Sequence, residues 1–209
     1  MVPWFYRLCQ FFLFCIFKVW NRFEIIGSEK IPHDPQGFIL APNHVSYLDP
    51  PVLGGGIKRP IVFLAKERLF KIRVLGRLIS MLGALPITGE SELKTIRSVI
   101  RSLKSGNVVV IFPEGTRSVE GELQEAQAGV GFLAQSANVP IVPCYIQGTR
   151  EAWPKGGFKF MPAKIKVFIG DAIRINRSSS DDRDALYQSA ADEVMKQIHH
   201  LRDSALNSK

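Results

Sequence analysis

Residues 43–50, with the sequence NHVSYLDP, restrict how the middle of this chain can fold. Prolines stand directly before this segment and at its end, and each disfavours helix in the residue that precedes it. On a continuous helix, His44 and Asp49 would point about 140° apart, because each residue turns the chain by ~100°. We therefore expect a loop or turn that runs into a short helix, with the apolar residues 38–41 as the strand leading into it.

His44 and Asp49 are the two residues of this segment that suit acid–base chemistry. A neutral imidazole is the usual general base near neutral pH, and a carboxylate behind it fixes the tautomer and stabilises the imidazolium. Ser46 lies between them, but the GxSxG context of a nucleophilic serine is missing. A catalytic pair here would therefore act on a nucleophile that belongs to the substrate. Alone, two fixed residues more often indicate a surface histidine and a turn-forming aspartate.

A second segment, IFPEGTRS at residues 111–118, follows the β-branched run 108–111, which predicts a buried strand. Gly115 permits a tight turn, and consecutive N–H groups in such a turn can form an anion-binding concavity. Arg117 adds a charged fork suited to phosphate, and Thr116 and Ser118 add hydroxyl donors. The segment therefore predicts a phosphate cradle at a strand end, although by itself it equally fits an ordinary loop with a solvated arginine.

The two segments together resemble the PlsC-type glycerolipid acyltransferases, the 1-acyl-sn-glycerol-3-phosphate acyltransferase family. The resemblance covers roughly residues 20–170 and extends to VPIVP at 139–143 and to the following Gly148 and Thr149. It implies an α/β fold and transfer of a fatty acyl group from acyl-CoA or acyl-acyl-carrier-protein to the free sn-2 hydroxyl of 1-acyl-glycerol-3-phosphate. The product would be phosphatidic acid, formed in phospholipid biosynthesis without a cofactor or metal.

The resemblance also assigns roles. His44 matches the family's catalytic base, Asp49 matches its orienting partner, and Pro143 matches the last block, which is associated with the acyl donor or with structure. The block that binds the acceptor phosphate falls on Glu114, Gly115, Thr116 and Arg117. Glu114 is expected either to hold Arg117 or to bind near the glycerol hydroxyls.

Two departures from the family pattern bear on the acceptor. The family often has an arginine after its second block, where this chain has residues 88–90 (TGE), and a lysine where this chain has Ala128. Both changes remove positive charge that could face a phosphate. They leave open whether the acceptor is lysophosphatidic acid, another lysophospholipid or glycerol-3-phosphate.

Residues 1–22 form the second informative stretch, because nearly all residues from 4 to 20 are apolar. A helix over this run would be ~25 Å long, against ~30 Å of bilayer hydrocarbon. Its polar residues fall within a stripe about 80° wide. These are Arg7, Gln10, Lys18 and Asn21. We expect an amphipathic interfacial helix at residues 1–22, followed by an acyltransferase domain at 23–209. The protein would be peripheral or monotopic at the cell membrane, with its active site on the cytoplasmic side. A tilted span, a buried helix and a cleaved signal peptide are alternatives.

Charge and cysteine content narrow the choice of partners. The chain has 27 Lys and Arg against 19 Asp and Glu, a net charge of +8, which suits anionic lipids or phosphate-bearing substrates. It carries no nucleic-acid-binding motif, and its three scattered cysteines suggest a reducing compartment without a disulfide framework or structural metal. Lys66 ends an expected strand on the presumed active-site side, so it is a further candidate to reach a phosphate. The basic, apolar residues 66–77 suggest a membrane-adjacent surface or a site for acyl-carrier protein.

The remaining pattern alternates strands with helices. Strands are expected at 23–26, 38–41, 61–65, 108–111, 141–146 and 164–169, and helices at 91–105, 124–137 and from about 180 to 201. The glycines at 54–56 suggest a flexible loop. This alternation predicts an α/β fold with a mixed central sheet covered by helices. Two other functions stay open: a hydrolase in which the histidine activates water, and a non-catalytic membrane-binding protein with the same fold.

Overall fold

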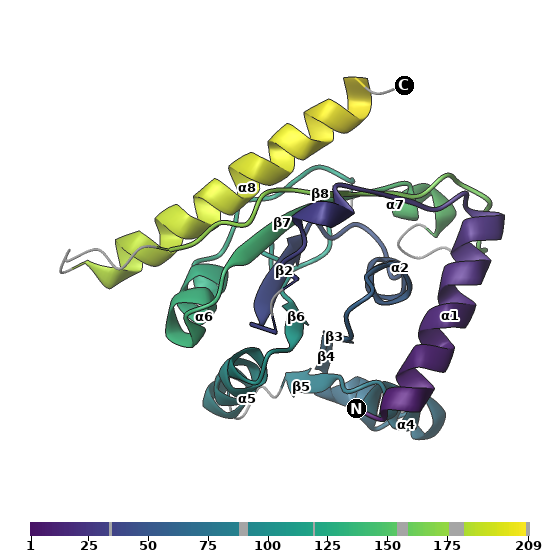
Figure 1. Ribbon diagram of the computed structural model, residues 1–209, viewed down its shortest axis with the longest axis horizontal. Coiled ribbons are helices and arrows are strands. Elements are labelled where there is room, and N and C mark those ends of the chain that lie inside the picture. The colour runs from purple at the N-terminus through teal and green to yellow at the C-terminus, as the bar shows by residue number, and fades with distance from the viewer. Residues whose placement is uncertain (34, 88–91, 119, 154–158, 176–181, 208–209) are drawn as a thin grey trace.

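A curled, six-stranded mixed sheet with helices around it forms the body of the computed structural model (Figure 1). The structure describes residues 1–33, 35–87, 92–118, 120–153, 159–175 and 182–207. The sheet order is β1-β8-β7-β2-β6-β3, and β4 and β5 form a separate two-stranded sheet. Only β7 and β8 pair antiparallel; the other neighbouring strands among those described are parallel. The predicted mixed α/β fold is therefore confirmed.

The strands are β1 Glu24–Ile26, β2 Phe38–Pro42, β3 Ile61–Val62, β4 Leu64–Lys66, β5 Leu85–Ile87, β6 Val108–Val110, β7 Ile141–Gln147 and β8 Lys166–Ile169. The α-helices are α1 Pro3–Trp20, α2 Asp49–Gly56, α3 Glu67–Phe70, α4 Arg73–Met81, α5 Glu92–Lys104, α6 Gly129–Ala137, α7 Thr149–Ala152 and α8 Arg183–Asn207. One 3₁₀ turn, η1, covers Ser28–Lys30.

The central strand β2 shows how the two faces of the sheet are used. Its side chains alternate between faces, as the pleat requires. Phe38 and Leu40 belong to the hydrophobic cluster shared with α2, whereas Ile39 and Ala41 belong to the cluster shared with α5, α6 and α8. All four are fully buried, so the sheet is covered on both faces and β2 delivers the following loop from the middle of the core.

Two expected elements differ in the structure. The run 61–65 is divided between β3 in the main sheet and β4 in the small one. The helix expected from 124 begins only at Gly129, because the backbone amides of Gln124 and Gln127 bond to the 111–118 segment instead of forming a helical turn. The start of α8 expected at 178–180 lies outside the described residues.

Residues 54–56, expected as a loop, lie inside α2, which tolerates prolines because they fall in its first turn. Glycine serves close packing here. A Cβ on Gly55 would lie 3.0 Å from Leu13 Cβ of α1, and one on Gly56 would lie 2.5 Å from the ring of Phe23. The absence of side chains therefore lets α2 approach α1.

Helix α1 confirms the expected helix, but its polar stripe faces the protein. Gln10 Nε2 donates to the carbonyls of Gly54 (3.0 Å) and Ile57 (2.7 Å), and Arg7 donates to that of Lys58. The outer face is apolar. Its exposed residues are Trp4, Leu8, Phe11, Phe12, Phe14, Ile16, Val19 and Trp20. Among the described helices, none is both long enough and apolar enough to cross a membrane.

Candidate active site

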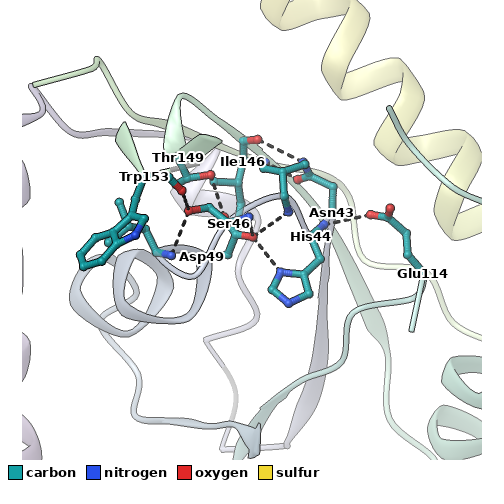
Figure 2. A network of polar contacts seen from close by, with 10 residues as sticks. Asn43, His44, Ser46, Asp49, Glu114, Ile146, Thr149 and Trp153 are labelled. Atoms are coloured by element: carbon teal, nitrogen blue, oxygen red, sulfur yellow. Dashed lines mark hydrogen bonds and ion pairs between the residues drawn. The ribbon is translucent and has the colours of Figure 1, made fainter. Parts of the chain in front are cut away.

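His44 and Asp49 meet at the carboxyl end of β2, where the chain leaves the sheet and enters α2 (Figure 2). Nδ1 of His44 lies 2.8 Å from Oδ2 of Asp49. The backbone N–H groups of Val45 and Ser46 donate to the same oxygen, each at 2.8 Å. The turn predicted from the prolines thus wraps the backbone around the carboxylate, which has no exposed surface.

Thr149 holds the other oxygen of this carboxylate. Its Oγ1 donates to Oδ1 of Asp49 at 2.7 Å, and the residue is fully buried at the start of α7 (Figure 2). The sequence had pointed to Thr149 only as part of a matching block and gave it no role. The two residues are 100 positions apart, and only the pairing of β2 with β7 brings them together.

The imidazole is fixed by a second contact that the sequence did not predict. The ring of Phe112 stacks on that of His44, with centroids 3.8 Å apart and an interplanar angle of 19°. Since Nδ1 faces Asp49, Nε2 is the ring nitrogen left to meet a substrate. The side chain of His44 is 17% exposed, which gives the ring limited access to solvent. The arrangement suits a general base aimed at an incoming hydroxyl.

Ser46 is occupied elsewhere and does not face His44 as a nucleophile. Its Oγ donates to the carbonyl of Trp153 at 2.7 Å and accepts the N–H of Leu48, and the residue is fully buried. Nearby, the Asn43 amide exchanges two hydrogen bonds with the backbone of Ile146 in β7. Both side chains therefore serve to hold the loop in place.

Glu114 connects the two sequence segments through their backbones. Its Oε1 accepts the N–H of His44 at 2.9 Å, and Oε2 accepts that of Gln124 at 3.2 Å. Among the described ion pairs none joins Glu114 to Arg117, so the expected support of Arg117 is not seen, and binding near the glycerol hydroxyls stays a prediction. Burial raises the pKa of Glu114 to about 7, with the two backbone hydrogen bonds opposing the shift and Asp49 adding to it.

The turn at Gly115 presents Arg117 beside the dyad. Gly115 has a φ of +70°, the left-handed conformation that glycine adopts without strain, as the sequence predicted. The guanidinium of Arg117 stacks on the ring of Tyr47 at 3.6 Å. Its Nη1 is buried and has no hydrogen-bond partner in the part of the chain that the structure describes. An unsatisfied, buried guanidinium nitrogen is costly in isolation and is therefore suited to an anionic ligand.

The other predicted binding residues are less enclosed. Thr116 is exposed and its Oγ1 bonds to Gln124 at 3.3 Å. Ser118, in contrast, is buried and donates its backbone N–H to the carbonyl of His44 at 2.9 Å. Lys66 is exposed at the end of β4 in the small sheet, and no described contact joins it to the dyad or to Arg117. Residues 88–90 lie outside the described residues. Within the described chain, no group of three or more His, Cys, Asp or Glu residues is placed to hold a metal.

Comparisons with known proteins agree with this geometry. The Acyltransferase family model matches residues 22–147. A 1-acyl-sn-glycerol-3-phosphate acyltransferase of Bacillus subtilis is 29% identical over 95% of this chain and 98% of its own length. One of Pseudomonas aeruginosa is 28% identical over 76% of this chain and 65% of its own length.

A solved structure shares the fold as well. The 1-acyl-sn-glycerophosphate acyltransferase PlsC of Thermotoga maritima superposes with a TM-score of 0.77 and 29% identity, covering 94% of this chain and 79% of that one. The helices and mixed sheet of the two proteins therefore correspond over nearly the whole of this chain. With the family model matching more than half of its residues, the chain belongs to the Acyltransferase family.

Proposed function

We propose that this protein transfers a fatty acyl group from a thioester donor, acyl-CoA or acyl-acyl-carrier-protein, to the sn-2 hydroxyl of 1-acyl-glycerol-3-phosphate. The product is phosphatidic acid, a step of phospholipid biosynthesis. The observation that carries this proposal is a pair of His44 with a buried Asp49, to which the described residues add no protein nucleophile, together with an arginine whose Nη1 has no partner among those residues. The names of the Bacillus and Thermotoga relatives support the same acceptor.

Proton transfer begins at Nε2 of His44. This nitrogen takes the proton of the sn-2 hydroxyl as its oxygen attacks the thioester carbonyl carbon. The C–S bond then breaks, the thiolate leaves, and the imidazolium returns the proton to sulfur. Asp49 holds the tautomer in which Nδ1 carries a proton and stabilises the imidazolium between the two steps.

Arg117 positions the acceptor. Its guanidinium meets the phosphate of the lysolipid, and stacking on Tyr47 fixes the plane of the fork. The hydroxyl of the exposed Thr116 and the backbone of the turn at Gly115 add hydrogen-bond donors for the phosphate. The exposed Lys66 at the end of β4 is a further candidate to bind it. Holding the phosphate places the sn-2 hydroxyl near His44, which makes the attack effectively intramolecular.

The test is release of thiol from palmitoyl-CoA in detergent micelles, with and without 1-acyl-glycerol-3-phosphate. We expect release that requires the acceptor and disappears in His44→Ala. Release by the intact protein without acceptor would instead indicate a hydrolase. If neither CoA nor carrier-protein donors support transfer to any lysolipid, the chain is a non-catalytic member of the family.

We also propose that the protein lies on the cytoplasmic face of the cell membrane through the outer face of α1. Val19 is 82% exposed and Trp4 is 67% exposed, and a continuous apolar helix face of this kind in water marks an interaction site. The backbone N–H of Val2 bonds to the carbonyl of Met81 at 2.8 Å, joining α1 to the end of α4. Helix α4 and its flanks add the exposed apolar residues Ile72, Val74 and Leu78 and the cations Arg68, Arg73 and Arg77.

Vesicle flotation tests this location. Phe11→Ser with Phe12→Ser should leave most of the protein unbound to vesicles containing anionic lipid, since each side chain is more than half exposed and contributes mainly through contact with lipid. A matched control replaces Leu93 on α5 and Leu206 on α8, which are 66% and 50% exposed. An equal loss of vesicle binding in both variants, or no loss in either, would contradict the proposal.

A further inference from the structure

The positive charge of this chain is concentrated in one part of its sequence. Residues 61–110 contain nine of the 27 lysines and arginines but only three of the 19 aspartates and glutamates. This stretch therefore carries most of the net charge of +8. It spans α3, α4, the small sheet and α5, none of which contributes a residue to the His–Asp pair.

Helix α5 arranges four of these cations in one row. Lys94, Arg97, Arg101 and Lys104 follow the spacing i, i+3, i+7 and i+10, which places them within about 80° on one helix face. All four are exposed. The opposite face carries Val99 and Leu103, which are 1% exposed and pack in the core. We call this row of four residues the α5 cationic stripe.

The stripe works against the stability of its own helix. Neighbours at i, i+3 and i, i+4 within it carry like charge, which destabilises an isolated helix. Lys94 lies in the first turn, where the helix dipole disfavours a cation, although Arg101 and Lys104 near the other end are favoured. Across the described chain, none of the four forms an ion pair. The four charges are therefore open to an external anionic surface.

The surroundings of the stripe distinguish it from the proposed membrane face. On α4, the cations alternate with exposed apolar residues such as Val74, 80% exposed, and α4 adjoins α1. On α5, Leu93 is the one large hydrophobic residue among those described that is exposed. Figure 1 shows α5 on the side of the molecule away from α1. A bilayer in contact with the outer face of α1 would therefore not reach the stripe.

One end of the stripe lies toward the edge of the sheet that carries the active site. Only residues 105–107 separate α5 from β6, so the chain reverses between them and the first turn of α5 lies toward the carboxyl edge of the sheet. At this edge β2 ends and delivers His44, because β2 and β6 are parallel. If the acyl donor bound along α5, a flexible arm that carries its acyl group could thus reach the base, His44.

We propose that the α5 cationic stripe docks an acidic acyl-carrier protein that presents its acyl thioester to His44. This inference rests on the proposed acyl transfer. Ten residues separate the first cation from the last, about 15 Å along the helix. Four charges spread on a convex helix over that length match an extended acidic protein surface. A free nucleotide such as CoA is typically bound in a concave site.

The experiment compares two donors with the same palmitoyl chain, acyl-carrier protein and CoA, in neutral detergent micelles with 1-acyl-glycerol-3-phosphate. The stripe variant is K94Q/R97Q/R101Q/K104Q. The control variant K30Q/K164Q/R183Q/K196Q removes the same charge from four exposed positions elsewhere. Thermal melts check folding, and the stripe variant should melt no lower than wild type because it relieves repulsion.

We expect the stripe variant to lose about 10- to 100-fold in kcat/KM with the carrier-protein donor and less than about twofold with acyl-CoA. The control variant should retain its kcat/KM with both donors. Added salt should reduce the difference in kcat/KM between the stripe variant and wild type with the carrier-protein donor. Equal loss with both donors, or no loss, would overturn the docking site. Transfer by wild type from CoA but not from the carrier protein would overturn it while leaving the proposed function intact. Transfer from neither donor would overturn both.

Discussion

The two halves of the active site are built in opposite ways. Around Asp49, both carboxylate oxygens have donors from within the protein, and the residue is fully buried. Around Arg117, the guanidinium stacks on Tyr47, which is 57% exposed, and leaves a buried nitrogen without a partner. One half is complete before substrate arrives, and the other is not.

This difference indicates a division of labour. The complete half holds a proton acceptor in one tautomer and one orientation, so defects there should appear in kcat. The incomplete half is satisfied only by an anion, so defects there should appear in the KM of the acceptor. The two kinetic constants can therefore test the comparison directly.

Asp49→Asn should have the largest effect, a fall of about 10³- to 10⁴-fold in kcat. The backbone N–H groups of Val45 and Ser46 would keep the amide oxygen of the asparagine in the place of Oδ2, but a neutral amide no longer stabilises the imidazolium that forms when His44 takes the proton. Steady-state kinetics with saturating donor measure this loss. An unchanged KM for the acceptor would support the assignment of Asp49 to proton transfer alone. A variant that retains the kcat of wild type would contradict the proposed difference between the two halves.

Arg117→Lys should come next, with KM for 1-acyl-glycerol-3-phosphate raised about 10- to 100-fold and kcat changed less than about threefold. Lysine keeps the charge but loses both the bidentate fork and the stacking on Tyr47. Arg183→Lys, on the exposed start of α8, is the control. A loss confined to kcat would mean that Arg117 acts on the transition state alone.

Thr149→Val should lower kcat about tenfold, since loss of one hydrogen bond to a charged, buried group costs roughly 1.5–3 kcal/mol, part of which appears in the reaction. Valine keeps the shape and removes only the donor to Oδ1. Thr149→Ser should restore most of the activity. A variant whose thermal stability falls while kcat is unchanged would assign Thr149 a purely structural role.

Glu114→Gln concerns the residue that joins the two halves, and its effect should be the smallest. The raised pKa of Glu114 means that its contribution to stability is fully present below about pH 4.5 and is lost as the pH rises toward about 7. The free energy of unfolding of the variant should therefore lack this part of its pH dependence. The expected difference is roughly 1–2 kcal/mol, because the ionised carboxylate still accepts two hydrogen bonds. Urea unfolding at a series of pH values gives the difference. Parallel curves for the two proteins would contradict the assignment.

Much of the fold and half of the site could be predicted from local sequence. Alternating apolar runs located the strands, and the proline-bounded segment located the turn that joins His44 to Asp49, because both signals act over a few residues. Contacts made through strand pairing had no such signal. Thr149 meets Asp49 only because β7 lies beside β2, and the stacking of Phe112 on His44 depends on β6 lying on the other side.

Other differences arose where tertiary packing overrode a local preference. Glycines 54–56 suggested a loop, but the helix continues through them, and a Cβ on Gly55 or Gly56 would crowd Leu13 of α1 or the ring of Phe23. The polar stripe of α1 suggested a water-facing side, yet Gln10 satisfies backbone carbonyls at the end of α2. In both cases, contacts between α1 and α2 that the local sequence does not encode determined the structure.

Helix α2 is hydrogen-bonded at both of its ends to other parts of the protein. Its first residue, Asp49, is bonded to the imidazole of His44, and the carbonyls of Gly54 and Ile57 at its far end are bonded to Gln10 of α1. Its eight residues span about 12 Å. Helix α2 therefore couples α1 to the carboxylate that orients the base, so that a displacement of α1 relative to the sheet would be transmitted to the imidazole of His44.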